Sequence, residues 1–343
     1  LFTQDSLALV SGGLGLALFA AVTYMAYVRS NKRLSTALAL GVLAMLAENY
    51  RHLLRPELIT LFYLIALLIL LEKLTQAISL YKLLLLFLLV TLWANTHGSF
   101  VLALPLSFVF ALDRIHHTTI SNITGRHWVT SCAADGLRWL ILPLAVLIGS
   151  LCTPFGTKLW VFSLGFTHHS VAKTEITEWM SPFDGRSLSI VGMYPGLVLS
   201  LVLLILLAWK RNHLPLRVIG TGLIFVYLAS LGNRFMVYQG IIFAWIAPAI
   251  WHEKNRISHW PEQTRLALLG LFLLLLLPLC IRYVNINGAY PFDARSNTLF
   301  SRGIVATLAE LPDGSNVFNS YDLGGELIYR GFPRIRPSID SRI

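Results

Sequence analysis

The chain has 343 residues, of which 56% are hydrophobic and 13% charged, and its formal net charge is +10. A soluble domain carries about 25% charged residues, so the charged fraction is roughly halved here. A soluble fold could not bury so many long apolar segments in one core, and the composition therefore excludes an ordinary soluble protein. In such a chain the positive charge bears on membrane orientation, and no nucleic-acid partner is expected.

Apolar runs bounded by charged residues predict about ten helices, which together would form an all-α polytopic transmembrane bundle. Several runs are nearer 15 than 20 residues, as is typical of helices packed inside a bundle. The run 34–50 is the weakest prediction, because it ends in the polar residues 48–51. The predicted ranges are 6–28, 34–50, 58–72, 78–95, 99–113, 138–153, 190–209, 215–232, 235–251 and 265–283.

Basic residues are distributed unevenly between the loops that join these runs. Alternate loops carry 14 of the 27 Lys and Arg residues, whereas the other loops, without the tail, carry six. The positive-inside rule places the richer set in the cytoplasm, and a chain of ten crossings that starts outside also ends outside. The richer set is Arg29, Lys32, Arg33, Lys73, Lys82, Arg114, Arg126, Arg138, Lys210, Arg211, Arg217, Lys254, Arg256 and Arg265.

The composition changes near residue 284, where Asn, Gly, Pro, Asp and Arg replace the leucine runs. We therefore predict a transmembrane domain over 1–283 and the start of a small extracytoplasmic α/β domain over 284–343. Apolar spacing predicts a helix over 298–311, and the segments 317–319 and 326–329 are predicted as short strands joined by a turn. Because the sequence opens at Leu1 within an apolar run, we expect a fragment that lacks both ends.

Four polar clusters lie where the predicted helices end on the outer side, and polar groups at such positions are costly unless they have partners or a function. The first contains Arg51, Arg55 and Glu57. Two arginines four residues apart share one helical face, and the guanidinium group suits phosphate. Contacts with lipid headgroups and an internal Arg–Glu pair are the structural alternative.

The second cluster is the segment 93–100, in which one helix ends and another begins almost at once. Gly98 permits a sharp turn, Ser99 is expected to cap the next helix, and Trp93 suits a membrane-interface anchor. Asn95 and His97 are candidates for substrate binding, and His97 for proton transfer. A turn histidine with satisfied hydrogen bonds is the alternative.

The third cluster covers 152–184. Residues 157–167 are expected to form an amphipathic helix in the membrane interface. Glu178 and Trp179 are candidates for holding a sugar, because a carboxylate accepts hydroxyl hydrogen bonds and an indole stacks on a sugar face. The spacing of His168 and His169 relative to nearby acids matches no familiar ligand pattern, and the scattered cysteines form no metal-binding motif, so no metal site is expected.

The fourth cluster is Arg234, which lies between two closely spaced predicted helices with almost no loop around it. Its side chain either extends toward the membrane surface or binds an anion. The predicted orientation places all four clusters on the extracytoplasmic side, which indicates a single polar site there.

These clusters resemble, in order along the chain, the motifs of bacterial polytopic proteins related to GT-C glycosyltransferases, a class that includes protein mannosyltransferases and lipid A aminoarabinose transferases. The resemblance spans residues 55–342. The motifs that carry it are Arg55-Pro56-Glu57-Leu58, Trp93-Ala94-Asn95-Thr96-His97-Gly98-Ser99-Phe100, Thr153-Pro154-Phe155-Gly156, Glu178-Trp179-Met180-Ser181-Pro182, Asn233-Arg234-Phe235, the segment 318–329 and Ser338-Ile339-Asp340-Ser341-Arg342.

The resemblance implies a GT-C-like enzyme of the bacterial inner membrane. It would move a sugar from a polyprenyl-phosphate donor to an extracytoplasmic acceptor, without a soluble cofactor. It implies phosphate binding by Arg55 and Arg234, with Arg51 behind them. His97, Asn95 and Glu178 would orient the sugar or the acceptor.

The family's catalytic acid lies in the first extracytoplasmic loop, which is expected to precede Leu1, so no catalytic residue is assigned; Glu178 and His97 are weak candidates. The alternatives are a non-enzymatic membrane subunit or scaffold with membrane-protein partners, or a transporter. Transporters typically show internal repeats and helices broken at mid-membrane. The sequence shows no clear repeat, and its unusual polar residues lie at helix ends, which disfavours transport.

Overall fold

The computed structural model of the chain describes residues 4–48, 56–123, 136–166, 178–184, 194–251, 263, 307–319, 324–331 and 333–338. The chain divides into two compact units, residues 9–271 and residues 1–8 with 272–343.

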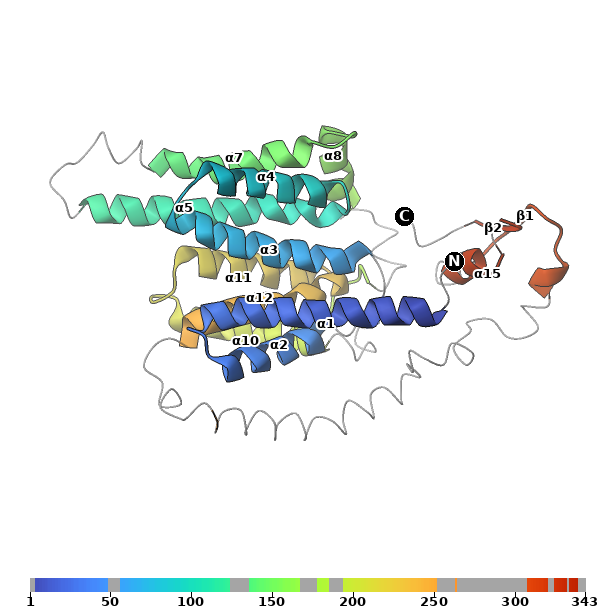
Figure 1. The fold of residues 1–343 in the computed structure, drawn as a ribbon, viewed down its shortest axis with the longest axis horizontal. Helices are drawn as coiled ribbons and strands as arrows, with labels where there is room; N and C mark the ends of the chain where they lie inside the picture. Colours follow the sequence, from blue (N-terminus) through green and yellow to red (C-terminus); the bar gives the residue numbers. More distant parts are fainter. Residues whose placement is uncertain are drawn as a thin grey trace. The chain divides into compact units, whose positions relative to one another are not determined.

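The first unit is a bundle of helices that lie along a common direction (Figure 1). Nine of the predicted runs correspond to described helices. Their ends are displaced by a few residues, except that the helix predicted over 99–113 continues to Ile123. The tenth run, 265–283, falls outside the described residues. The helices are α1 (Gln4–Arg29), α2 (Leu34–Glu48), α3 (Pro56–Gln76), α4 (Leu80–Ala94), η2 (Gly98–Leu102) leading into α5 (Ala103–Ile123), η3 (Arg138–Leu140) leading into α7 (Ile141–Leu151), α8 (Thr157–Phe166), α10 (Tyr194–Lys210), α11 (Leu216–Leu231), η6 (Asn233–Met236) and α12 (Val237–Trp251).

Three described helices are long and apolar enough to cross a membrane, namely Leu9–Arg29, Glu57–Gln76 and Gly98–Thr118. The other apolar helices of the described residues are shorter, at 10–17 residues. The chain is thus mainly helical and compatible with a membrane protein. A bundle of about ten spans stays a prediction.

One face of α4 shows how the bundle presents its apolar side chains. Leu80, Leu84, Leu88 and Leu92 recur every four residues and are each more than 50% exposed. A contiguous exposed leucine row is rare on soluble proteins and is typical of a surface that contacts lipid. The opposite face of α4 is buried, with Val90 and Trp93 at 0% exposure.

Small residues allow α2 and α12 to pack closely. A Cβ atom on Gly240 of α12 would lie 2.5 Å from Cα of Ala44 in α2, so only glycine fits at this crossing. Close approach through small residues is typical of helix pairs in membranes, where packing rather than water exclusion drives association. The packing of α2 against α12 therefore requires a residue without a side chain at position 240.

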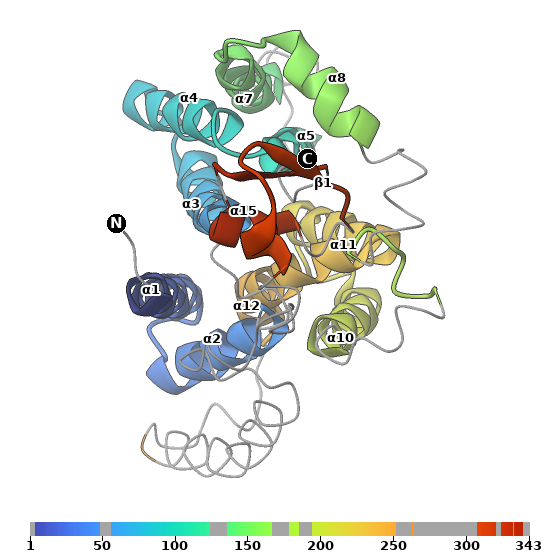
Figure 2. The same cartoon turned by 90° about the vertical axis from the view of Figure 1, so that its right-hand side faces the viewer.

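The helix predicted over 157–167 is present as α8. It is seen along its length in Figure 2, where most helices of the bundle are seen end-on, so it lies across the bundle direction. Trp160 packs edge-on against Phe100, whereas Val161, Phe162 and Leu164 are 50–73% exposed. The helix is therefore present with an apolar exposed face, and its location in a membrane interface stays a prediction.

The second unit contains a small parallel sheet. β1 (Ser315–Val317) pairs with β2 (Ile335–Pro337), with Ser315 opposite Ile335, and α15 (Gly324–Gly331) lies between them in the chain. The predicted strand over 326–329 is wrong, because this segment is helical. Parallel strands need a crossover connection, and α15 supplies it while burying Leu327. Of the predicted helix 298–311, residues 307–310 are described and helical.

Gly240→Ala is expected to lower the free energy of unfolding by about 1–3 kcal/mol, because the added methyl group overpacks the α2–α12 contact. Gly165→Ala in α8 is the matched control, since a Cβ atom there meets nothing within 4 Å. Thermal unfolding of the purified protein in detergent measures both. Equal unfolding temperatures for the two variants would contradict the packing account.

Candidate functional site

Helix α3 carries a glutamate near each of its ends, and each glutamate forms an ion pair. Glu57 lies in the first turn and Glu72 near the last, about 22 Å apart at 1.5 Å per residue. We name the two ends of the bundle after them, the Glu57 end and the Glu72 end. The predicted orientation makes the Glu57 end extracytoplasmic.

At the Glu57 end, Arg234 pairs with Glu57. Arg234 Nη2 lies 2.6 Å from Glu57 Oε1, and the two side chains are 18% and 13% exposed. A guanidinium group has five donors, and Glu57 is the single acceptor that the guanidinium of Arg234 contacts within the described ranges. The pair fixes the direction of the guanidinium while most of its donors stay uncommitted in this part of the chain.

The turn that carries Arg234 is held by the short segment 178–184. The backbone N–H of Arg234 donates to the carbonyl of Glu178 at 2.8 Å, and that of Asn233 donates to the carbonyl of Met180 at 3.0 Å. Ser181 Oγ donates to the carbonyl of Ser230 at 3.0 Å. The third and fourth predicted clusters are therefore joined by backbone hydrogen bonds.

Trp179 lies with its ring against the guanidinium group of Arg234. Arg234 Cζ is 3.9 Å from the centroid of the Trp179 ring, and the edge of Phe235 meets that ring at 6.3 Å between centroids. A cation over an indole is stabilised by the ring quadrupole. One ring face is thus used to position Arg234.

A chain of hydroxyl groups connects α3 to the second predicted cluster. His97 Nδ1 lies 2.7 Å from Ser99 Oγ, and Ser99 Oγ lies 3.3 Å from Oγ1 of Thr60. Thr60 follows Glu57 by three residues and so shares its face of α3. Trp93 Nε1 also donates to Ser99 Oγ, at 3.1 Å. His97 is therefore tied to the same end of α3 as the Arg234 pair.

The hydrogen bonds of His97 define its tautomer. Its Nδ1 accepts the backbone N–H of Ser99 at 3.2 Å, which caps helix η2. An N–H group can only donate, so Nδ1 of the neutral ring is the acceptor and Nε2 carries the proton. The neutral ring presents a donor at Nε2. The predicted cap by Ser99 is wrong, since His97 is the capping residue.

Asn95 and Trp93 have structural partners. Asn95 Nδ2 donates to the carbonyls of Thr91 and Cys152, at 2.8 and 2.9 Å, and so joins the ends of α4 and α7. The prediction of Trp93 as an interface anchor is wrong, because its side chain is 0% exposed and stacks on Tyr63 at 5.7 Å. The buried ring fills the core beneath the polar cluster.

The structure thus brings together Glu57, His97, Glu178, Trp179 and Arg234 at one end of the bundle, with Asn95 beside them. Arg51 and Arg55, the other two predicted substrate-binding residues, lie outside the described residues, as do His168 and His169. Within the described ranges, no group of three or more His, Cys, Asp or Glu side chains is placed to hold a metal ion.

The opposite end holds a network that the sequence reasoning missed. Glu72 Oε1 accepts from Arg29 Nη1 at 2.7 Å and from Arg217 Nε at 3.3 Å, and Arg217 Nη1 pairs with Asp113 Oδ2 at 2.6 Å. Arg29 also donates to the carbonyl of Trp245 at 2.6 Å and lies over its ring. Two cations and two carboxylates balance here, and they join α1, α3, α5, α11 and α12.

A signal for this network was present in the sequence. Glu72 and Asp113 are carboxylates at the ends of apolar runs, where an unpaired charge is costly. Each therefore implied a cation nearby. The distribution of basic residues indicates only that Arg29 and Arg217 are charges near loops, and it does not reveal these partners.

No protein-family model, curated protein or solved structure matches this chain.

Glu72→Met is expected to lower the free energy of unfolding by about 2 kcal/mol, because it leaves Arg29 and Arg217 to share the single charge of Asp113. Adding Arg29→Met should recover part of the loss, since Arg217 and Asp113 then form a balanced pair. Thermal unfolding in detergent checks both. Lys73→Gln, at the exposed neighbour, is the control and should change stability by less than about 0.5 kcal/mol. A double variant less stable than Glu72→Met would refute the charge-balance account.

Proposed function

We propose that the chain is a GT-C-like membrane glycosyltransferase, which moves a sugar from a polyprenyl-phosphate donor to an extracytoplasmic acceptor. The observation that carries this proposal is the arrangement of Arg234. Its guanidinium is held between Glu57 and the face of Trp179, at the end of the bundle where His97 also lies. An arginine fixed in this way is suited to a phosphate, which it contacts through two donors at once.

The chemistry needs a positive group at the leaving phosphate. When the acceptor hydroxyl attacks the anomeric carbon, the bond from that carbon to the phosphate oxygen breaks, and the lipid phosphate gains negative charge. A donor that is already aimed at this oxygen lowers the barrier without reorganising during the reaction. In the proposal Arg234 has this role, and Arg51 and Arg55 add positive charge to it.

Other residues would orient the substrates. The Nε2–H of neutral His97 is a donor for a phosphate or sugar oxygen, while Glu178 and Asn95 would contact sugar or acceptor hydroxyl groups. A general base must also remove the acceptor proton. The resemblance assigns this base to the first extracytoplasmic loop of the family, so in our proposal the residues named here bind substrate and stabilise charge. The Glu57 end would face the extracytoplasmic side of the bacterial inner membrane, as would residues 284–343.

One observation favours a second candidate, a non-enzymatic membrane subunit. Glu57 balances the charge of Arg234 at 2.6 Å, and a purely structural ion pair would have the same geometry. The pair would then fasten α3 to the turn before α12. Activity and stability measurements on the same variants separate the two candidates.

Arg234→Ala is expected to lower turnover of a polyprenyl-phosphate sugar by about 10²–10³-fold, the usual loss when a donor to a developing oxyanion is removed. The turnover of Arg234→Lys should lie between those of the unmodified protein and Arg234→Ala, because lysine keeps the charge and loses the fork of donors. Lys158→Ala, at an exposed cation at the start of α8, is the control and should stay within about twofold. Transfer of labelled sugar by the purified full-length protein measures all three. Unchanged turnover in Arg234→Ala, with reduced thermal stability, would support the structural subunit instead.

Two substitutions of His97 separate the capping role of its Nδ1 acceptor from the proposed substrate contact of its Nε2–H donor. Asn places a side-chain oxygen near the position of Nδ1 and can keep the bond from Ser99 N–H, whereas Gln places an amide N–H near Nε2. If Nε2–H contacts substrate, the activity of His97→Asn should be about tenfold lower than that of His97→Gln. If Nδ1 caps the helix, His97→Asn should keep more thermal stability than His97→Gln. Parallel losses of activity and stability in both variants would mean that His97 acts only as a cap.

A further inference from the structure

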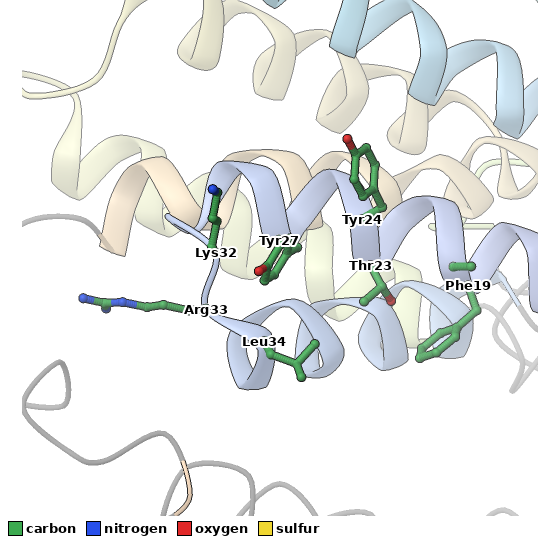
Figure 3. Close-up of a pocket in the computed structure, with 8 residues that line it drawn as sticks. Phe19, Thr23, Tyr24, Tyr27, Lys32, Arg33 and Leu34 are labelled. Carbon is green, nitrogen blue, oxygen red and sulfur yellow. The ribbon is translucent and has the colours of Figure 1, made fainter.

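The hairpin of α1 and α2 forms a surface groove at a distance from the Arg234 site. The groove has a volume of about 690 Å³ and is lined by residues of both helices and the turn between them. Figure 3 shows Phe19, Thr23 and Tyr27 following one another along α1, with Leu34 on α2 and with Lys32 and Arg33 at the joined end. Because Arg29 of the same turn pairs with Glu72, the groove belongs to the Glu72 end.

The walls of the groove are mainly carbon. Phe19, Ala20 and Leu34 are apolar, and Tyr24 and Tyr27 contribute rings with a polar tip. Tyr24 is 61% exposed and Leu34 45% exposed, so both already face the surroundings of the bundle. A tyrosine at such a position is typical of the boundary between lipid tails and headgroups.

The turn at the end of the groove holds two cations in an unusual backbone conformation. Asn31 and Lys32 have positive φ angles of 54° and 61°, which cost non-glycine residues about 1 kcal/mol or more each. The N–H of Lys32 donates to the carbonyl of Tyr27 at 2.9 Å, and this bond closes the helix. The tight reversal places Lys32 and Arg33 directly at the mouth of the groove.

These two cations differ from the others of the same end. Arg29 and Arg217 are neutralised by Glu72 and Asp113. Lys32 and Arg33 contact no carboxylate within the ranges that the structure describes, and Lys32 is exposed. Their charge is therefore available to an anion from outside the protein.

We propose that this groove binds one anionic phospholipid, with an acyl chain along the α1–α2 groove and the headgroup phosphate on Lys32 and Arg33. The volume falls in the range of pockets for small ligands, and apolar walls that end in two cations complement an acyl chain attached to a phosphate. The proposal concerns the end of the bundle opposite Arg234 and does not depend on the enzymatic activity.

The test is native mass spectrometry of the purified full-length protein, titrated in detergent with phosphatidylglycerol or phosphatidylcholine of the same acyl chains. We expect one retained phosphatidylglycerol and weaker retention of phosphatidylcholine. Lys32→Gln with Arg33→Gln should weaken phosphatidylglycerol binding about thirtyfold, which corresponds to about 1 kcal/mol for each cation. Ala20→Trp, which fills the groove without changing charge, should weaken both lipids equally.

Lys210→Gln with Arg211→Gln is the matched control, because it removes two neighbouring cations from the α10–α11 turn of the same end. It should leave phosphatidylglycerol binding within about twofold. Equal retention of the two lipids by the unmodified protein, or equal losses in the two double variants, would overturn the proposal. Preferential retention of a polyprenyl phosphate, or a protein dimer that Ala20→Trp abolishes, would assign the groove to a different occupant and overturn it as well.

Discussion

The bundle depends on one constraint, which is that the carboxylate near each end of the apolar helix α3 must be paired with a cation. Neither Glu57 nor Glu72 can be buried without a cation, since an unpaired charge in apolar surroundings costs several kcal/mol. Glu57 finds Arg234, and Glu72 finds Arg29 and Arg217. The partners lie far away in the sequence, so pairing them fixes α1, α11 and the turn before α12 around α3.

The two ends satisfy the same constraint with different consequences. At the Glu72 end, the network of Arg29, Arg217, Glu72 and Asp113 contains two cations and two carboxylates, so its charges balance. At the Glu57 end, the guanidinium of Arg234 is covered by Trp179 on one face and anchored by Glu57, and a donor histidine lies on the same side of α3. This asymmetry is why we place the substrate phosphate at the Glu57 end and treat the other end as a structural joint.

Much of the helical framework could be predicted from the sequence, because an apolar run has the same meaning wherever it packs. The ranges 6–28 and 215–232 differ by only a few residues from Gln4–Arg29 and Leu216–Leu231. The strand predicted over 326–329 was wrong, because a run of four apolar and polar residues fits a strand or a helix equally well. The crossover between β1 and β2 requires a helix there. The prediction of Trp93 as a membrane-interface anchor was wrong, because the position of an aromatic residue at a helix end does not reveal which way its ring points.

The candidate site was predictable only in part. Its members could be singled out by polarity, since each stands where an apolar helix ends. Their contacts could not, because Glu57 and Arg234 are 177 positions apart and many cations were available to each carboxylate. The same limit applies to His97, whose spacing suggests a ligand group, whereas its bond to Ser99 N–H gives it a capping role as well.

The most direct measurement is a structure of the full protein with a bound, non-reactive polyprenyl-phosphate sugar. The account predicts phosphate oxygens within about 3 Å of the Arg234 guanidinium, with Trp179 still beneath it and His97 Nε2 directed toward the ligand. A lipid phosphate bound elsewhere, with Arg234 engaged by Glu57 alone, would contradict it.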